Sequence, residues 1–382
     1  MSVRSALARR SAPGVRLARP VQLRTATAGL MAVALSLVAM PAGALGAPDA
    51  VRARPVTSSS SPLPGLSPTG KALAMYGRPR SGLAWHTGFW AGGRMGTPRM
   101  LAAEAWAGRR FDVVTAYPLF ATWDDLAGDS SIRLFDGWPG RLSYGVPMLP
   151  ANRPGEWADV TSGAHDQVFA AIARSLVAHG RGDSMVRVGV ESNGPWEPWV
   201  VTRTTAPAYR AAFRRIVNVM RAQAPRLTFW MDLAAGSGLR GQRNRLDVLT
   251  QLYPGDAYVD GISMDHYDAY QLAARSTATW RLALAPSTGA GLADGAAFAR
   301  AHHKGFAVPE WGLEPVQRQQ AGQGGGDDPL FIRLMHDFFV ANRDVLVYEA
   351  YFNEPAPYIR NAIFSPAQNP RSAATYLSLF RR

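Results

Sequence analysis

From about residue 72 onward, short hydrophobic runs alternate with longer stretches in which apolar residues recur at helical spacing. This alternation is typical of repeated βα units, which build parallel sheets. Eight such units close a barrel, so the sequence predicts an α/β fold, a (β/α)8 TIM barrel that forms a single domain over residues 72–382. An open, doubly wound sheet is the second choice. The eight predicted strands are Gly82–Thr87, Phe111–Tyr117, Leu142–Met148, Met185–Glu191, Leu227–Asp232, Val259–Asp265, Gly305–Glu310 and Val345–Tyr351.

Two of the predicted helices can be argued from individual residues. Pro207 suits the first turn of a helix, and Thr204 and Thr205 precede it as cap candidates. A second helix is bounded by Asp166 and Gly180. Each has an apolar stripe, which predicts that both cover the outside of the barrel. The stripes are Tyr209, Phe213, Ile216, Val217 and Met220 in the first helix, and Phe169, Ile172, Leu176 and Val177 in the second.

The first 71 residues have a different character. Arginines are followed by an apolar stretch from Gly29 to Met40 and then by small residues, which is the three-part pattern of a secretory leader over residues 1–47. The apolar stretch is shorter than the ~20 residues that cross a bilayer, so no stable membrane anchor is expected after leader removal. Residues 48–71 are rich in Ser, Pro and Thr and predict a flexible linker. We therefore expect a secreted, extracellular protein.

Composition and missing motifs exclude several kinds of chemistry. The chain has no cysteine, so disulfides, metal–thiolate sites and thiol nucleophiles are excluded. The formal net charge is +13, but six arginines lie before residue 48 and the remaining excess is spread along the chain, so no nucleic-acid partner is expected. The histidines are scattered, and no zinc-protease, serine-hydrolase or dinucleotide motif occurs. We expect no metal, no cofactor and a monomer.

Two predicted strands end in a glutamate, and reactive groups of such barrels stand at the carboxyl ends of the strands. Strand alternation places Glu191 on the inward face with Arg187, and Glu310 on the inward face with Phe306 and Val308. Two inward carboxyls are what glycosidic bond cleavage requires, and a separation of roughly 5–5.5 Å gives retention of configuration. Pairing of a strand-end glutamate with Arg187 for structure alone is the alternative.

Aromatic residues beside these glutamates favour a carbohydrate cleft. Trp196 and Trp199 follow Glu191, and Trp311 directly follows Glu310. Indole rings pack on the apolar faces of sugars, and Asn193 offers a donor and an acceptor for hydroxyls. Three tryptophans without such neighbours are predicted to fill the core instead. They are Trp106, Trp123 and Trp280.

Three ordered segments resemble family 26 of the glycoside hydrolases, the family of many endo-β-mannanases. RVGVESNGPWEPW, from Arg187 to Trp199, resembles the segment that carries the acid/base of that family. LYPGDAYVDGISMDHY, from Leu252 to Tyr267, is similar to the segment that leads to its sixth strand. VPEWG, from Val308 to Gly312, is similar to its nucleophile strand. The segments cover most of the second half of the chain.

The resemblance implies a retaining enzyme that acts on a polysaccharide, most closely an endo-β-1,4-mannanase. In that case Glu191 is the general acid/base, Glu310 is the nucleophile, and Tyr267 hydrogen-bonds the nucleophile. Asn193, Trp196 and Trp199 match positions that line the cleft, and Asp265 supports the site beside Arg187. Burial and a neighbouring negative charge would keep Glu191 protonated, as this role requires.

The sequence also departs from the family pattern. Val190 stands where the family commonly has a histidine, and Glu197 replaces a usual aromatic residue. Xylan or mixed-linkage glucan therefore remains an alternative substrate, and a secreted carbohydrate-binding barrel without turnover remains an alternative function. Glu349 and Glu354, near the last strand, are alternative nucleophiles outside any comparable motif.

Overall fold

The chain folds into a closed barrel of eight parallel strands, in sequential order from β1 to β8. The computed structural model describes residues 76–92, 96–269, 274–316 and 324–381, so the predicted leader and linker lie outside the described residues. The predicted (β/α)8 barrel is confirmed, and an open doubly wound sheet is excluded because β1 pairs with β8. The strands are β1 His86–Trp90, β2 Val113–Ala116, β3 Arg141–Val146, β4 Met185–Val188, β5 Thr228–Ala234, β6 Gly261–Tyr267, β7 Gly305–Gly312 and β8 Leu346–Phe352.

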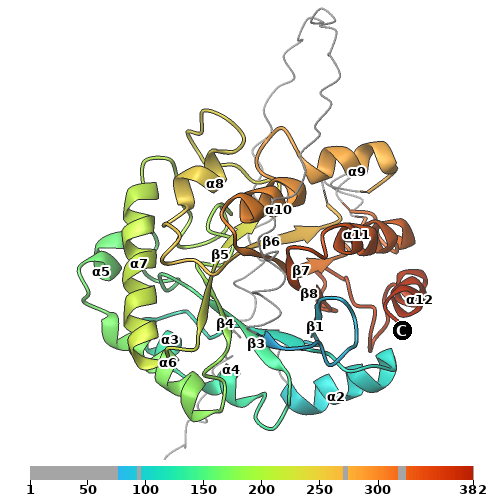
Figure 1. Cartoon of the computed structure of the whole chain (residues 1–382), viewed down its shortest axis with the longest axis horizontal. Helices are drawn as coiled ribbons and strands as arrows, with labels where there is room; N and C mark the ends of the chain where they lie inside the picture. Colours follow the sequence, from blue (N-terminus) through green and yellow to red (C-terminus); the bar gives the residue numbers. More distant parts are fainter. Residues whose placement is uncertain (1–75, 93–95, 270–273, 317–323, 382) are drawn as a thin grey trace, which may run out of the picture.

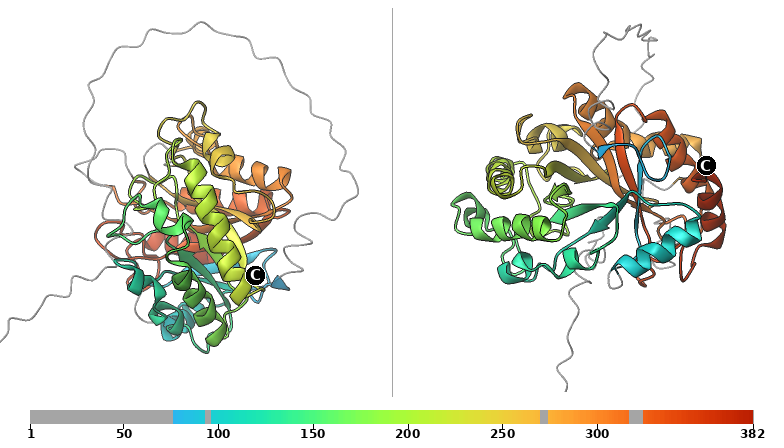
Figure 2. Two further views of the ribbon diagram at one scale, coloured as in Figure 1. Left: turned by 90° about the vertical axis from the view of Figure 1, so that its left-hand side faces the viewer. Right: turned by 60° about the horizontal axis from the view of Figure 1, so that its bottom comes forward.

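Helices surround the strands as an outer layer, which Figure 1 and the turned views of Figure 2 show. In the described part of the chain, none of them is both long and apolar enough to cross a membrane. The helices are α2 Gly96–Ala107, α3 Trp123–Ala127, α4 Ser130–Arg133, α5 Trp157–Thr161, α6 Asp166–Ala178, α7 Ala206–Gln223, α8 Asp247–Leu252, α9 Thr277–Leu284, α10 Leu292–Ala301, α11 Pro329–Ala341 and α12 Pro370–Leu379.

The two helices argued from the sequence form and cover the barrel. Pro207 lies in the first turn of α7, where its missing N–H removes no helical hydrogen bond. All five stripe residues of α7 are fully buried, as are three of the four in α6. The prediction for Val177 is wrong: its side chain is 49% exposed, because it lies near the end of α6 on the edge of the stripe.

The hydrophobic core has two parts, one on each side of the strands. The larger part fills the space between strands and helices, and Trp280 belongs to it while Trp106 and Trp123 pack against it, as predicted. The smaller part fills the inside of the barrel. There Trp230 of β5 meets Tyr348 of β8 edge to face, with ring centroids 5.4 Å apart. The barrel is therefore a packed core, and the space for chemistry lies at its carboxyl-terminal mouth.

Strand alternation holds through β4 but fails in β7. As predicted, Val186, Val188 and Val190 lie in the outer core while Arg187 points inward. β4 ends at Val188, and Gly189 then takes a φ of +67°, so Glu191 lies on the turn beyond the strand. In β7 the pairing with β8 shifts register between Val308 and Trp311. Phe306 and Val308 therefore face the helices, in the outer core, and the prediction that they share the inward face with Glu310 is wrong.

Candidate active site

Arg187 organises the carboxylates at the mouth of the barrel. It points inward from β4 and is fully buried. Its guanidinium forms ion pairs with Asp232 of β5 at 3.1 Å, Asp265 of β6 at 3.4 Å and Glu310 of β7 at 2.7 Å. Three strands distant in sequence are thus joined through one cation, and Arg187 fixes where each carboxylate lies.

Glu310 is held by donors on both carboxyl oxygens. Oε1 accepts hydrogen bonds from Arg187 and from the Tyr117 hydroxyl, and Oε2 accepts one from the Tyr267 hydroxyl at 3.0 Å. The backbone N–H of Glu310 donates to Asp265 Oδ1 at 3.0 Å, which fixes the main chain as well. These contacts orient the carboxylate and stabilise its negative charge, as a nucleophile requires.

Glu191 occupies a tight turn that Asp232 stabilises. Its φ of +47° lies in the left-handed region, which a residue with a side chain adopts only where its surroundings impose it. Here Asp232 Oδ1 accepts the Glu191 N–H at 2.9 Å. The side chain is also fixed, because Trp196 Nε1 donates to Glu191 Oε2 at 2.6 Å. Asp232 therefore positions the turn that presents Glu191.

Glu191 differs from Glu310 in what surrounds its carboxyl group. Burial, and after it the negative charge of the nearby Glu310, raise the pKa of Glu191 to about 8. The Trp196 hydrogen bond opposes this shift without cancelling it. At neutral pH Glu191 is therefore protonated, whereas Glu310 is surrounded by donors. Two carboxyls with such opposed surroundings can serve as proton donor and nucleophile.

Two of the tryptophans predicted to line the cleft do not reach it, so those predictions are wrong. Trp311 is fully buried facing the helices, where its Nε1 donates to Glu349 Oε2 at 2.6 Å. Trp199 is also fully buried, and its Nε1 donates to the Val190 carbonyl at 2.7 Å. Both rings are core residues whose polar edge is satisfied inside the protein. Only Trp196 retains a partly exposed ring beside Glu191.

Asn193 is a structural residue, which corrects its predicted role in sugar binding. Its Nδ2 donates to the carbonyls of Ala234 and Ser237, each at 2.8 Å, and its Oδ1 accepts the Ala234 N–H at 2.8 Å. Both amide hydrogens are therefore used, and none remains for a sugar hydroxyl. The side chain joins the turn after β4 to the end of β5.

We expect Asn193→Ala to lower the free energy of unfolding by about 1–3 kcal/mol, because the substitution leaves buried backbone groups unpaired. Urea denaturation measures this loss. An unchanged unfolding midpoint would show that the side chain is dispensable to the fold and would contradict this structural role.

Glu349 lies on the other side of the sheet from the candidate site. It is fully buried and accepts hydrogen bonds from Thr87 Oγ1 at 2.5 Å and from Trp311. Glu354 is partly exposed and lies 3.5 Å from Nε1 of Trp90, the last residue of β1. In the described part of the chain, neither glutamate is hydrogen-bonded or ion-paired to Arg187, whereas Glu310 is bound to it in both ways.

Sequence reasoning missed three residues at this mouth. The Tyr117 hydroxyl donates a hydrogen bond to Glu310, and Asp232 accepts the backbone N–H of Glu191. Trp90 packs edge to face on Tyr117, with ring centroids 5.4 Å apart. Tyr117 and Asp232 each end a predicted strand, so the rule that selected the glutamates could have found them. Trp90 lies beyond the end of the predicted first strand, because β1 begins at His86 and not at Gly82.

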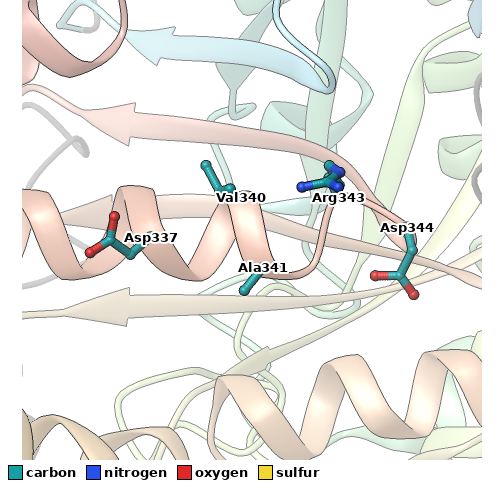
Figure 3. Close-up of a pocket in the computed structure, with 5 residues that line it drawn as sticks. All are labelled: Asp337, Val340, Ala341, Arg343 and Asp344. Atoms are coloured by element: carbon teal, nitrogen blue, oxygen red, sulfur yellow. The ribbon is translucent and has the colours of Figure 1, made fainter.

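A hollow of about 430 Å³ lies elsewhere on the surface, between the end of α11 and the start of β8 (Figure 3). The start of β8 is at the amino-terminal end of the barrel, opposite the mouth that holds the carboxylates. Its five lining residues come from one stretch of chain, Asp337 to Asp344. The hollow is therefore separate from the candidate site.

Among the described residues, no three His, Cys, Asp or Glu side chains are grouped to hold a metal ion.

Comparison with known proteins shows which enzymes share this barrel. No protein-family model matches the chain. The catalytic domain of a family 26 endo-β-1,4-mannanase from Bacillus sp. JAMB-750 is similar with a TM-score of 0.56 and 17% identity, over 83% of this chain and 91% of that domain. A modular endo-β-1,4-mannanase from Cellulomonas fimi is similar with a TM-score of 0.58 and 17% identity, over 82% of this chain and 74% of the mannanase chain.

One further solved structure and one sequence relative are also similar to this chain. A family 26 β-mannanase from Bacteroides ovatus is similar with a TM-score of 0.54 and 14% identity, over 82% of this chain and 93% of that chain. Endoglucanase H from Acetivibrio thermocellus is 25% identical over 196 residues, which are 47% of this chain but only 19% of the endoglucanase. The chain is thus a (β/α)8 barrel with the fold of the family 26 glycoside hydrolases, which confirms at the level of the fold the resemblance of its three sequence segments.

Proposed function

We propose that this protein hydrolyses β-glycosidic bonds of a polysaccharide with retention of configuration, as an endo-β-1,4-mannanase-like glycoside hydrolase. Glu191 gives its proton to the oxygen of the leaving sugar while the Glu310 carboxylate attacks the anomeric carbon, so that a glycosyl ester forms as the glycosidic bond breaks. Glu191, now ionised, takes a proton from water, and the resulting hydroxide equivalent displaces Glu310. The reaction consumes only water.

The observation that carries this proposal is the difference between the two carboxyls. Burial and the charge of Glu310 raise the pKa of Glu191 to about 8, which supplies a proton donor at neutral pH. Arg187, Tyr117 and Tyr267 surround Glu310 with donors. A carbohydrate-binding barrel without turnover has no use for this division of roles, and burying the carboxyls would only destabilise it.

Mannan is the first candidate substrate, since solved structures with the same fold are named as β-mannanases. A β-glucan is the second, because the curated relative is named as an endoglucanase. Xylan remains a third candidate on chemical grounds. Val190 is buried in the outer core, so its side chain affects which polysaccharide is cleaved only indirectly.

A substrate panel tests the proposal. The purified protein is incubated with β-mannan, β-xylan and mixed-linkage β-glucan, and the release of reducing ends is measured. We expect cleavage of β-mannan, with Glu191→Gln and Glu310→Gln as inactive controls. Binding of a glycan without cleavage, unchanged in Glu191→Gln, would favour a binding protein instead.

The pH dependence of the reaction follows from the pKa of Glu191. The acid works only while protonated, so we expect kcat/KM to fall as the pH rises, with a midpoint near pH 8. Trp196→Phe removes a hydrogen bond that favours the ionised form, so the midpoint should move to higher pH. A midpoint near the ordinary glutamate value of 4.5, or no shift in Trp196→Phe, would contradict the assignment.

We also propose that the protein is exported and acts outside the cell as a monomer. The arginine-rich start, the apolar stretch and the small residues before Pro48 support the export. Expression of the full chain in a secreting host should yield a mature protein that begins near Pro48 in the medium. Amino-terminal sequencing of the secreted protein and its elution volume in gel filtration test the two parts separately.

A further inference from the structure

Trp90 is one of two partly exposed tryptophans at the mouth of the barrel. Seven of the eleven tryptophans are buried, and four remain partly exposed. Two of these four, Trp106 and Trp123, lie on α2 and α3 and pack against the outer core. The other two lie at the mouth, where Trp196 follows β4 and Trp90 ends β1. Trp90 and Trp196 are therefore the indoles that a glycan at the mouth can contact.

Trp90 is linked to Glu310 by two series of ring contacts. It packs edge to face on Tyr117, with ring centroids 5.4 Å apart, and the Tyr117 hydroxyl donates to Glu310. It also stacks on Phe352, with ring planes 7° apart and centroids 5.5 Å apart. Phe352 meets Tyr267 edge to face at 6.1 Å, and the Tyr267 hydroxyl donates to Glu310 at 3.0 Å. Trp90 therefore has a fixed place beside the candidate nucleophile.

The ring contacts leave part of Trp90 open to solvent. Phe352 is only 8% exposed, whereas Trp90 keeps partly exposed apolar surface at the end of β1. Removing such surface from water is favourable, so a ligand with an apolar face gains binding energy there. A sugar ring has this kind of face, since its C–H groups pack on an indole while its hydroxyls at the ring edge stay free for hydrogen bonds.

Trp90 and Trp196 accompany different carboxyls. Trp196 Nε1 donates to Glu191, the group that protonates the oxygen of the leaving sugar in the proposed reaction. Trp90 instead packs on Tyr117, whose hydroxyl binds Glu310. Glu310 forms the ester with the sugar that stays behind. These contacts therefore place Trp90 on the nucleophile's side of the cleaved bond.

We propose that Trp90 is a stacking platform for the glycan on the nucleophile's side of the cleaved bond. It binds a sugar of the part of the chain that remains on Glu310 in the glycosyl ester. A sugar ring on the indole covers the apolar surface that Tyr117 and Phe352 leave exposed. This inference rests on the proposed function and names one binding contact within it.

Binding to a protein that cannot turn over separates this role from positioning of Tyr117. In the Glu310→Gln background, calorimetric titration with β-1,4-mannohexaose, or with the hexasaccharide of whichever glycan the wild type cleaves, gives Kd. Trp90→Leu keeps an apolar side chain against Tyr117 and Phe352 but removes the flat ring, so Kd should rise by about tenfold or more. Trp90→Phe keeps a flat ring, and its Kd should stay within about threefold.

Trp106→Leu is the matched control. Trp106 is also partly exposed and packs on Phe364, with ring centroids 5.4 Å apart, but it lies in the outer layer. Its substitution should leave Kd unchanged. Unchanged Kd in Trp90→Leu, with a lower kcat in the active protein, would make Trp90 a positioning residue and overturn the inference. Equal weakening in Trp90→Leu and Trp90→Phe would contradict stacking.

Protection from oxidation is a second test and needs no substitution of Trp90. The Glu310→Gln protein is treated with N-bromosuccinimide with and without the hexasaccharide, and peptide mass spectrometry measures oxidation of each tryptophan. The sugar should protect Trp90 and leave Trp106 equally oxidised, whereas equal oxidation of Trp90 would overturn the inference. A wild type that cleaves no glycan but binds mannohexaose through Trp90 would overturn the proposed function alone, and absence of both cleavage and binding would overturn both.

Discussion

The Glu310→Gln variant should lose glycan cleavage by at least about 10³-fold in kcat, because the amide that replaces the carboxylate is too weak a nucleophile to form the glycosyl ester. The barrel should remain folded, since Arg187 keeps its ion pairs with Asp232 and Asp265. Reducing-end assays give the rate, and circular dichroism with a thermal melt reports the fold.

Glu354→Gln is the matched control for this prediction. Glu354 is a partly exposed glutamate just beyond β8, and the sequence left it open as an alternative nucleophile. We expect its substitution to change kcat by only a few-fold. Retained activity in Glu310→Gln together with lost activity in Glu354→Gln would make Glu354 the nucleophile and overturn the assignment.

Arg187→Met should have the largest effect on stability. The substitution removes the one cation that pairs with Asp232, Asp265 and Glu310, and leaves these carboxylates buried beside one another. Breaking a buried ion pair from one side lowers the free energy of unfolding by about 3–5 kcal/mol. Equilibrium unfolding in urea, read by tryptophan fluorescence, measures this change.

Arg215 provides the comparison for Arg187. It forms a two-point ion pair with Asp166, at 2.7 and 2.8 Å, between α7 and α6, but it is partly exposed to water. Because water screens such pairs, Arg215→Met should alter the unfolding midpoint only slightly. Equal decreases in stability in the two variants would mean that the ion pairs of Arg187 stabilise the fold no more than an exposed pair does. Arg187 would then not organise the carboxylates of the site.

The barrel could be predicted because parallel strands buried on both faces appear as short hydrophobic runs separated by amphipathic helices. All eight runs became strands. The boundaries were less certain: the first strand begins at His86, beyond most of the run predicted from Gly82, because the residues before His86 form turns. Runs of similar hydrophobicity do not show where pairing with the neighbouring strand begins.

The direction of side chains in β7 could not be predicted from alternation. A shift of register between Val308 and Trp311 breaks the two-residue period and leaves no clear signal in the hydrophobic pattern. Beyond the shift, Glu310 faces the mouth and its neighbour Trp311 faces the helices, as adjacent residues of a strand do. Glu310 itself was found because it ends a predicted strand and lies in a segment similar to family 26.

Aromatic residues next to a catalytic candidate are a weak guide to a sugar cleft. Trp199 and Trp311 have the neighbours expected of cleft residues, yet both are buried and donate their N–H groups inside the protein. A tryptophan fits either role, because it combines a large apolar surface with one polar edge. Only the packing around the ring decides, and that packing comes from residues far away in the sequence.

The stereochemistry of the first product tests the central claim, that Glu191 and Glu310 act on the same glycosidic bond as proton donor and nucleophile. Proton NMR of an early hydrolysis mixture, with the polysaccharide that the enzyme cleaves, shows which anomer of the new reducing end appears first. The account predicts the β-anomer, followed by slow mutarotation to the α-form, because two displacements restore the configuration. The α-anomer appearing first would mean a single displacement by water, and Glu310 would not be the nucleophile.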